Sequence, residues 1–157
     1  MTMKLTSTAF NHETAIPSRF TCDGSNVSPP LSWSGLPAGT KSLALVVTDP
    51  DAPDPKAPKT TWVHWVLYDL PADATGLREA IASKGLPPGA LEGTNDFGRT
   101  GYGGPCPPIG RHRYVHTLYA LDTVLADLDR PPRARLLAAM EGHVLKTAEL
   151  IGTYQRQ

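Results

Sequence analysis

The sequence of 157 residues has no excess of charge of either sign, no long apolar run and only two cysteines. Its 15 basic side chains balance its 15 acidic ones, which argues against bulk attraction to nucleic acid or to an anionic membrane. No apolar run approaches the roughly 20 residues of a membrane-spanning helix, and the polar N-terminus has no signal-peptide core. We therefore expect a cytoplasmic protein that binds no nucleic acid and does not insert into a membrane.

The two cysteines, Cys22 and Cys106, are far apart in the sequence. We expect them to form neither a metal-ligand pair nor a disulfide framework. A zinc site would need Cys106 to converge with His64, His112 and His116, and the sequence has no zinc-binding motif at these positions. The sequence therefore predicts no metal and no cofactor.

Proline and glycine are abundant instead, with 16 and 14 residues. So many helix breakers argue against a helical bundle and for long shaped loops, here Asp49–Pro58 and Gly85–Gly110. The segment Val144–Tyr154 fits a helix or a strand, and Gly152 favours the strand. The remaining patterns predict short helices at Thr75–Ser83 and Pro131–Glu141, and strands at Met3–Phe10, Leu31–Trp33, Leu43–Thr48, Trp62–Leu70 and Arg113–Leu121. This order predicts a mainly β sandwich with a single domain over residues 1–157.

The first candidate for chemistry is an acidic corner at the end of the buried strand Leu43–Thr48. Asp49 and Asp51 lie two residues apart in Asp49-Pro50-Asp51-Ala52-Pro53, where two prolines make the backbone rigid. A plain turn has the same composition. The position directly after a buried strand favours a functional role.

The second candidate is His64, in the strand Trp62–Leu70. Alternation places His64 on one face with Trp62 and Val66, and places Val63 on the other face with Trp65. A single histidine in a strand also fits a structural residue with satisfied hydrogen bonds.

The third candidate is the loop Gly103–Pro108 with the strand that follows it. Alternation puts His112, Tyr114 and His116 on one face, where two imidazoles and a phenol can each donate a hydrogen bond. Glycine lets backbone N–H groups approach a ligand closely, so loop and strand together suit an anion or phosphate. A core strand with polar residues facing solvent is the alternative.

These three clusters resemble the two motif blocks of the phosphatidylethanolamine-binding protein family, in particular its bacterial branch. The blocks read Asp49-Pro50-Asp51-Ala52-Pro53 with Trp62-x-His64, and Gly104-Pro105-Cys106-Pro107-Pro108 with His112-Arg113-Tyr114. Similar stretches occur along nearly the whole chain, at Phe20–Gly24, Ser28–Trp33, Thr40–Leu45, Asn95–Gly98 and Leu150–Tyr154.

The resemblance implies a sandwich of two antiparallel sheets with a few peripheral helices and a small anion pocket at one end. It implies a ligand that is phosphate or a phosphorylated head group, and it brings no established reaction, so we expect no enzyme. The residues that it assigns to ligand binding are Asp49, Asp51, His64, Gly104, Pro105, Cys106, His112 and Tyr114. It also suggests cis peptide bonds at Ala52–Pro53 and Thr60–Thr61, and it leaves the role of His116 open.

Two other functions stay open, a serine-type protease inhibitor with a protease as partner and an acid–base hydrolase. A homodimer is compatible with the neutral surface. If the pocket binds an anion, a carboxylate beside a histidine predicts tighter binding as the pH falls from about 8 to about 6.

Overall fold

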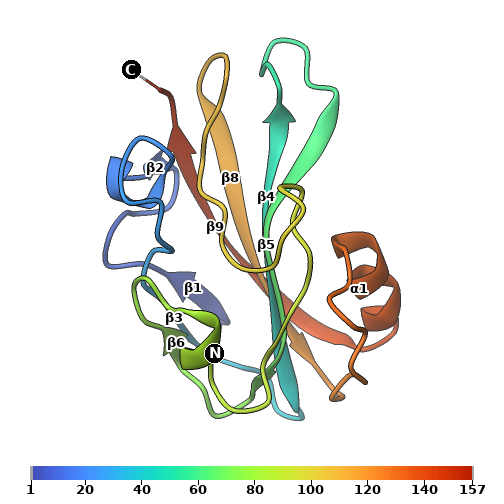
Figure 1. Cartoon of the computed structure of the whole chain (residues 1–157). Coiled ribbons are helices and arrows are strands. Elements are labelled where there is room, and N and C mark those ends of the chain that lie inside the picture. Colours follow the sequence, from blue (N-terminus) through green and yellow to red (C-terminus); the bar gives the residue numbers. More distant parts are fainter. Residues whose placement is uncertain (1, 157) are drawn as a thin grey trace.

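Residues 2–156 of the computed structural model form a six-stranded and a three-stranded β-sheet with one α-helix, α1 (Arg133–Met140) (Figure 1). The order in the large sheet is β2 (Thr14–Ala15), β9 (Val144–Tyr154), β8 (His112–Leu121), β4 (Ser42–Ala52), β5 (Thr60–Pro71) and β7 (Leu91–Glu92). The small sheet contains β1 (Lys4–Thr6), β3 (Leu31–Ser34) and β6 (Gly76–Leu77). All pairings are antiparallel except that of β2 with β9. The expected mainly β sandwich is confirmed.

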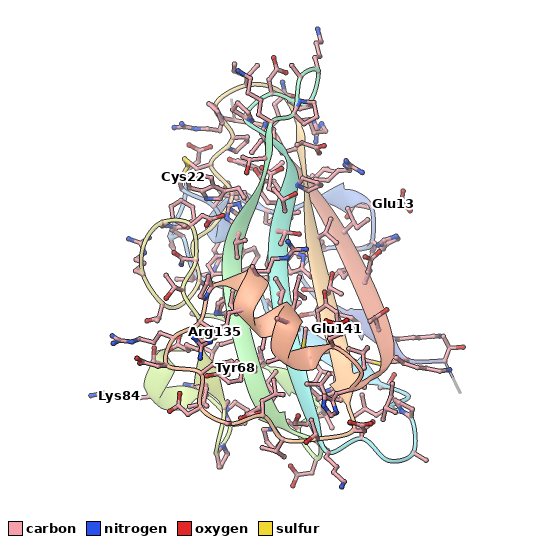
Figure 2. All side chains as sticks on the ribbon, turned by 90° about the vertical axis from the view of Figure 1, so that its right-hand side faces the viewer. Glu13, Cys22, Tyr68, Lys84, Arg135 and Glu141 are labelled. Carbon is pink, nitrogen blue, oxygen red and sulfur yellow. A yellow bond between two sulfur atoms is a disulfide. The ribbon has the colours of Figure 1, made fainter. Side chains whose placement is uncertain are left out.

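The large sheet is covered on both faces. The small sheet lies on one face of it, and α1 (Arg133–Met140) lies on the other (Figure 1). Figure 2 views the large sheet with α1 in front of it. Strand β4 alternates between two apolar clusters: Leu45 and Val47 pack toward the small sheet, whereas Val46 packs with Leu136 of α1. This double burial explains why β4 is apolar at successive positions.

Most expected elements are present, with shifted ends. The helix predicted over Pro131–Glu141 is α1, and Val144–Tyr154 is strand β9. The helix predicted at Thr75–Ser83 is wrong. Leu77 pairs with Leu31 in the small sheet, and Ala80 has a φ of 56°, which a right-handed helix excludes.

The acidic corner is also organised differently from the expected loop. Strand β4 continues through Asp49 to Ala52, so the loop begins later than predicted. The Ala52–Pro53 bond is cis as expected, whereas Thr60–Thr61 is not among the cis bonds of residues 2–156.

Cys22 and Cys106 form a disulfide, which contradicts the expectation that they would not pair. Their Cα atoms are 5.4 Å apart although 84 residues separate them in the sequence. The expectation failed because sequence separation does not limit distance in a sandwich, where remote loops meet at one end. Among residues 2–156, no helix is long and apolar enough to cross a membrane.

Candidate functional site

A cavity of about 240 Å³ opens at the end of the large sheet where β4 ends and where β5 and β8 begin. Its walls are mainly apolar, and its polar side chains come from three neighbouring strands. The lining residues are Asp49, Ala52, Pro53, Trp62, His64, Phe97, Cys106, Pro107, Pro108, His112 and Tyr114. The cavity therefore brings together five of the eight residues that the sequence suggested, namely Asp49, His64, Cys106, His112 and Tyr114.

The other three suggested residues lie behind the wall. Asp51 is buried against Arg113, whose backbone N–H and guanidinium both donate to it at 2.8–3.0 Å. These hydrogen bonds hold the pKa of the Asp51 carboxyl below its usual range. Asp51 therefore connects β4 to β8, and its carboxylate is already occupied by a protein partner.

Gly104 and Pro105 face the loop that carries Cys22. The Gly104 N–H donates to Asn26 Oδ1 at 2.9 Å, and the Pro105 carbonyl accepts from the Cys22 N–H at 3.0 Å. A Cβ atom at Gly104 would collide with Asn26 Oδ1 and with the Phe20 carbonyl, so only glycine fits. The Gly104 N–H therefore bonds within the protein and is not available as a donor to a ligand.

Asp49 and His112 form a fully buried pair. Asp49 Oδ2 lies 2.6 Å from His112 Nδ1, and Asp49 Oδ1 accepts the Asp51 N–H at 2.7 Å. The other ring nitrogen of His112, Nε2, lies 2.8 Å from the Ile109 carbonyl. Because the Ile109 carbonyl can only accept, Nε2 carries a proton, and the close contact of Nδ1 with a carboxylate favours a second proton on that nitrogen. Both ring nitrogens are therefore engaged within the protein, and the expected hydrogen bond from His112 to a ligand finds no free N–H.

His64 is the extra residue of a β-bulge in β5. Val47 of β4 pairs with Trp65 and Thr48 pairs with Val63, which leaves His64 between them. The expected alternation is therefore wrong here, because Val63 packs with the α1 cluster whereas Trp65 packs in the core between the sheets. The bulge directs the imidazole into the cavity.

The neighbours of His64 determine its tautomer. His64 Nδ1 donates to the Gly103 carbonyl at 2.7 Å, so Nε2 is the nitrogen left for a ligand. The ring packs edge-on against Tyr114 and Phe97, with centroids 5.2 and 5.4 Å away. Burial lowers the pKa of His64, more than the Gly103 carbonyl and Asp49 raise it. The imidazole is therefore neutral in the empty cavity at neutral pH.

Tyr114 carries a buried hydroxyl without a hydrogen-bond partner among residues 2–156. The ring stacks on His112 with centroids 6.4 Å apart. Burial, reinforced by the negative charge of Asp49, raises the pKa of Tyr114 well above its usual range. Its hydroxyl therefore keeps its proton and is a donor without an acceptor.

The sequence reasoning did not select the apolar part of the wall as site residues. Trp62 and Phe97 meet edge to face at 5.6 Å, and the remaining members are Ala52, Pro53, Pro107 and Pro108. Phe97 reaches the cavity because Asn95 Oδ1 accepts the N–H groups of Phe97 and Arg99 and shapes the turn. The motifs contained all six residues, but apolar types do not indicate binding on their own.

His116 lies outside the cavity. Its Nδ1 lies 3.1 Å from the carbonyls of Tyr114 and Leu150, and its ring packs against Phe10. Burial lowers the pKa of His116 to about 4. The expectation that His116 shares a face with His112 and Tyr114 is met, but its contacts are structural.

Comparisons with known proteins find a matching family model and several similar proteins. The family model described as "Phosphatidylethanolamine-binding protein" matches residues 6–155. A protein of Methanothermobacter thermautotrophicus, described as UPF0098, is 54% identical over 98% of this chain and 99% of its own length. A phosphatidylethanolamine-binding protein homologue from Chlamydia trachomatis has a crystal structure with TM-score 0.90 and 42% identity, covering 99% of this chain and 98% of its own. Escherichia coli YbcL gives TM-score 0.89 at 34% identity, with 99% of both chains covered.

Proposed function

The chain belongs to the phosphatidylethanolamine-binding protein family, and on that premise we propose that it binds phosphate or a phosphorylated head group in the cavity above Asp49 and His112. The cavity volume of about 240 Å³ suits a small head group rather than a whole lipid. We assign no reaction to the site, because the ring nitrogens of His112 are both engaged within the protein.

One observation carries this proposal, the unpartnered hydroxyl of Tyr114. Buried polar groups in native proteins nearly always have a partner, and one without a partner calls for an explanation. The hydroxyl belongs to a residue of the cavity wall, where a bound anion would supply the missing acceptor. His64 Nε2 offers a further contact on the same wall, because Nδ1 is the nitrogen that bonds to Gly103.

The charges of the wall agree with an anionic ligand. The negative charge of Asp49 is balanced by the His112 imidazolium and by the Asp51 N–H, so a second anion is not directly opposed. Trp62 and Phe97 give the cavity an apolar rim beside its polar side chains. Electrostatic attraction is stronger in such an environment than in bulk water.

Replacing Tyr114 with phenylalanine tests this proposal. We expect the affinity for phosphorylethanolamine to fall roughly tenfold or more, because a hydrogen bond to a charged group is lost. We expect the free energy of unfolding to stay equal or to rise by about 1 kcal/mol, because an unsatisfied buried hydroxyl is removed. Calorimetric titration and urea unfolding measure the two quantities.

The matched control for this experiment is Tyr102→Phe. Tyr102 is also a tyrosine near the site, but its hydroxyl already donates to the Phe20 carbonyl at 2.8 Å. This variant is therefore expected to lose about 1 kcal/mol of stability and to keep most of its affinity. Unchanged affinity in Tyr114→Phe, with normal binding by the parent protein, would contradict the assignment of the hydroxyl to the ligand.

The pH dependence of binding is expected to follow from His64. Because burial lowers the pKa of His64, the free imidazole takes up its proton only below the ordinary value, whereas a bound anion raises that pKa again. Affinity should therefore increase as the pH falls, by up to about tenfold per unit, and level off below the pKa of the free protein. Because the free pKa is lowered, the increase in affinity extends to lower pH than the sequence suggested.

Sulfate is the suitable probe for this measurement, because its own charge does not change in the neutral range. Titration in two buffers of different ionisation enthalpy gives the number of protons taken up on binding. His64→Gln is the control and should bind sulfate with the same affinity at each pH. If the parent protein takes up no proton, His64 does not contact the anion.

A further inference from the structure

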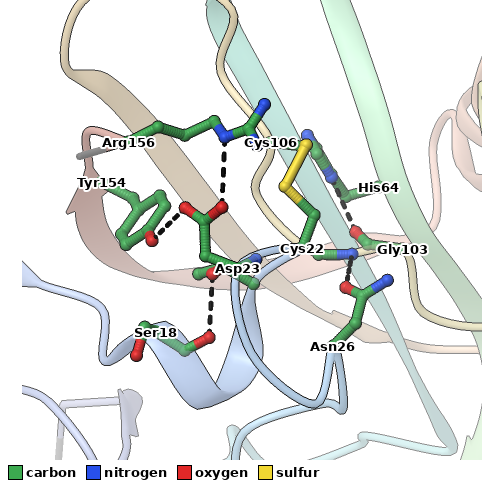
Figure 3. The surroundings of a disulfide bond; sticks show 11 residues. Ser18, Cys22, Asp23, Asn26, His64, Gly103, Cys106, Tyr154 and Arg156 are labelled. Atoms are coloured by element: carbon green, nitrogen blue, oxygen red, sulfur yellow. Dashed lines mark hydrogen bonds and ion pairs between the residues drawn. A yellow bond between two sulfur atoms is a disulfide. The ribbon is translucent and has the colours of Figure 1, made fainter.

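The Cys22–Cys106 disulfide joins the wall of the cavity to a second loop. Cys106 lines the cavity, whereas Cys22 lies in the loop that follows the short 3₁₀ turn Ser18–Phe20. Figure 3 places this bond beside His64, Gly103 and Asn26. The bond therefore lies next to the residues that define the proposed binding site.

The two sulfur atoms belong to residues that differ in their access to solvent. Cys106 is exposed at the mouth of the cavity, whereas Cys22 is half-buried. A thiol from solution therefore reaches Cys106 more easily than Cys22. Exposed disulfides are the more readily exchanged ones, whereas buried structural disulfides resist reduction.

The disulfide is directly connected to the contacts that orient His64. The Gly104 N–H and the Pro105 carbonyl both bond to the loop of Cys22, at 2.9 and 3.0 Å. The neighbouring Gly103 accepts from His64 Nδ1 at 2.7 Å and donates its own N–H to the His64 carbonyl at 3.0 Å. A release of Gly103–Cys106 therefore alters the hydrogen bond that fixes the tautomer of His64.

We propose that the Cys22–Cys106 disulfide is a thiol-exchange site that controls the shape of the cavity wall. In the first step a thiolate attacks Cys106 Sγ, the protein disulfide breaks, and Cys22 leaves as a thiolate that takes up a proton. In the second step another thiol attacks the outer sulfur of the mixed disulfide and releases Cys106. Two small thiols are oxidised to one disulfide, and the protein disulfide is reduced to two thiols.

Control of the cavity wall by thiol exchange has a reciprocal consequence for ligand binding. This consequence rests on the proposed function. If reduction weakens anion binding, a bound anion must stabilise the oxidised form to the same extent. Because Cys106 lines the cavity, a ligand there also covers part of its surface. Binding should therefore protect the disulfide from reduction.

Amide hydrogen exchange tests the proposal without any ligand. The oxidised protein, the protein reduced with dithiothreitol and the Cys22→Ser/Cys106→Ser variant are compared by NMR. We expect the N–H groups of Cys22 and Gly104 to exchange about tenfold faster or more in the last two samples through local opening that depends little on urea, whereas Leu45 in the core loses protection only through global unfolding, which depends steeply on urea. Unchanged exchange at Gly104 overturns the proposal, and so does exchange at Gly104 that rises with urea as steeply as that of Leu45, because the bond then acts on global stability alone.

Phosphorylethanolamine titration of the same samples tests the effect on binding. We expect about tenfold weaker affinity after reduction, and slower reduction by glutathione when phosphorylethanolamine is present. The double serine variant should not respond to dithiothreitol, and an equal response in that variant would overturn the proposal. If the oxidised protein does not bind phosphorylethanolamine, the proposed function fails, whereas amide exchange still decides whether the disulfide controls the wall.

Discussion

Replacing Asp49 with asparagine is expected to lower the free energy of unfolding by about 3–5 kcal/mol, because it removes one partner of a buried ion pair. The side chains of His112 and Asp49 are only 0% and 5% exposed, and their atoms lie 2.6 Å apart. An amide cannot balance the imidazolium, so His112 must either stay charged without compensation or lose a proton and one of its two hydrogen bonds. Urea unfolding at neutral pH measures the loss.

The same variant should bind phosphorylethanolamine roughly tenfold more weakly, because His112 and the cavity wall lose the contact with the Asp49 carboxylate that positions them. Removal of a carboxylate charge by itself would favour an anion. Glutamine or asparagine at other acidic positions should not have this effect. Circular dichroism first verifies that the variant is folded. Calorimetric titration at neutral pH without urea then separates weaker binding from unfolding.

The chain offers a matched control for this substitution. Asp122 and His143 form a similar pair at 2.8 Å, but their side chains are 44% and 45% exposed. Asp122→Asn should therefore change stability by less than about 1 kcal/mol. If Asp49→Asn and Asp122→Asn lower the free energy of unfolding equally, burial does not explain the contribution of the Asp49–His112 pair to stability.

Much of the fold was accessible from the sequence because its signals are local. The apolar run of β4 and the start of α1 after two prolines both follow from short stretches of sequence. The prediction of a helix at Thr75–Ser83 is wrong because the apolar residues there, although helically spaced, belong to a short strand and a turn. Leu77 fills the core through a two-residue strand, and the positive φ of Ala80 turns the chain back.

The polar part of the site was accessible for a related reason. Asp49, His64 and His112 are polar residues at the ends of apolar strands, and such positions meet at one end of a sandwich. Their detailed contacts were not accessible. His112 uses both of its ring nitrogens within the protein because the Ile109 carbonyl lies beside Nε2. His64 enters the cavity because a β-bulge in β5 turns it there. Neither feature leaves a signal in the spacing of residue types.

The disulfide could not be predicted because it depends on long-range topology. Cys22 and Cys106 belong to loops that are 84 residues apart in the sequence and that lie together at one end of the sandwich. Two cysteines in a chain expected in the cytoplasm favour free thiols. The correct pairing required the positions of both loops in space.

Removing this disulfide is expected to lower the free energy of unfolding by about 4–5 kcal/mol in the chain-entropy description of cross-links. The bond closes a segment with a sequence separation of 84 residues, so the oxidised unfolded chain is strongly restricted. The Cys22→Ser/Cys106→Ser variant and the reduced parent protein should show the same loss in urea unfolding. Both should remain folded at 25 °C, because domains of this size commonly have about 5–15 kcal/mol of stability.

The entropic origin of this loss can be separated from the local contacts beside the bond. Asn26→Ala removes the acceptor of the Gly104 N–H and leaves the disulfide intact, so it should cost only about 1–2 kcal/mol. In the double serine background the same substitution should cost less, because the two loops are no longer held in register. If instead Asn26→Ala alone costs as much as losing the disulfide, the loop contacts stabilise this end of the sandwich. The cross-link would then act on the native state rather than on the unfolded chain.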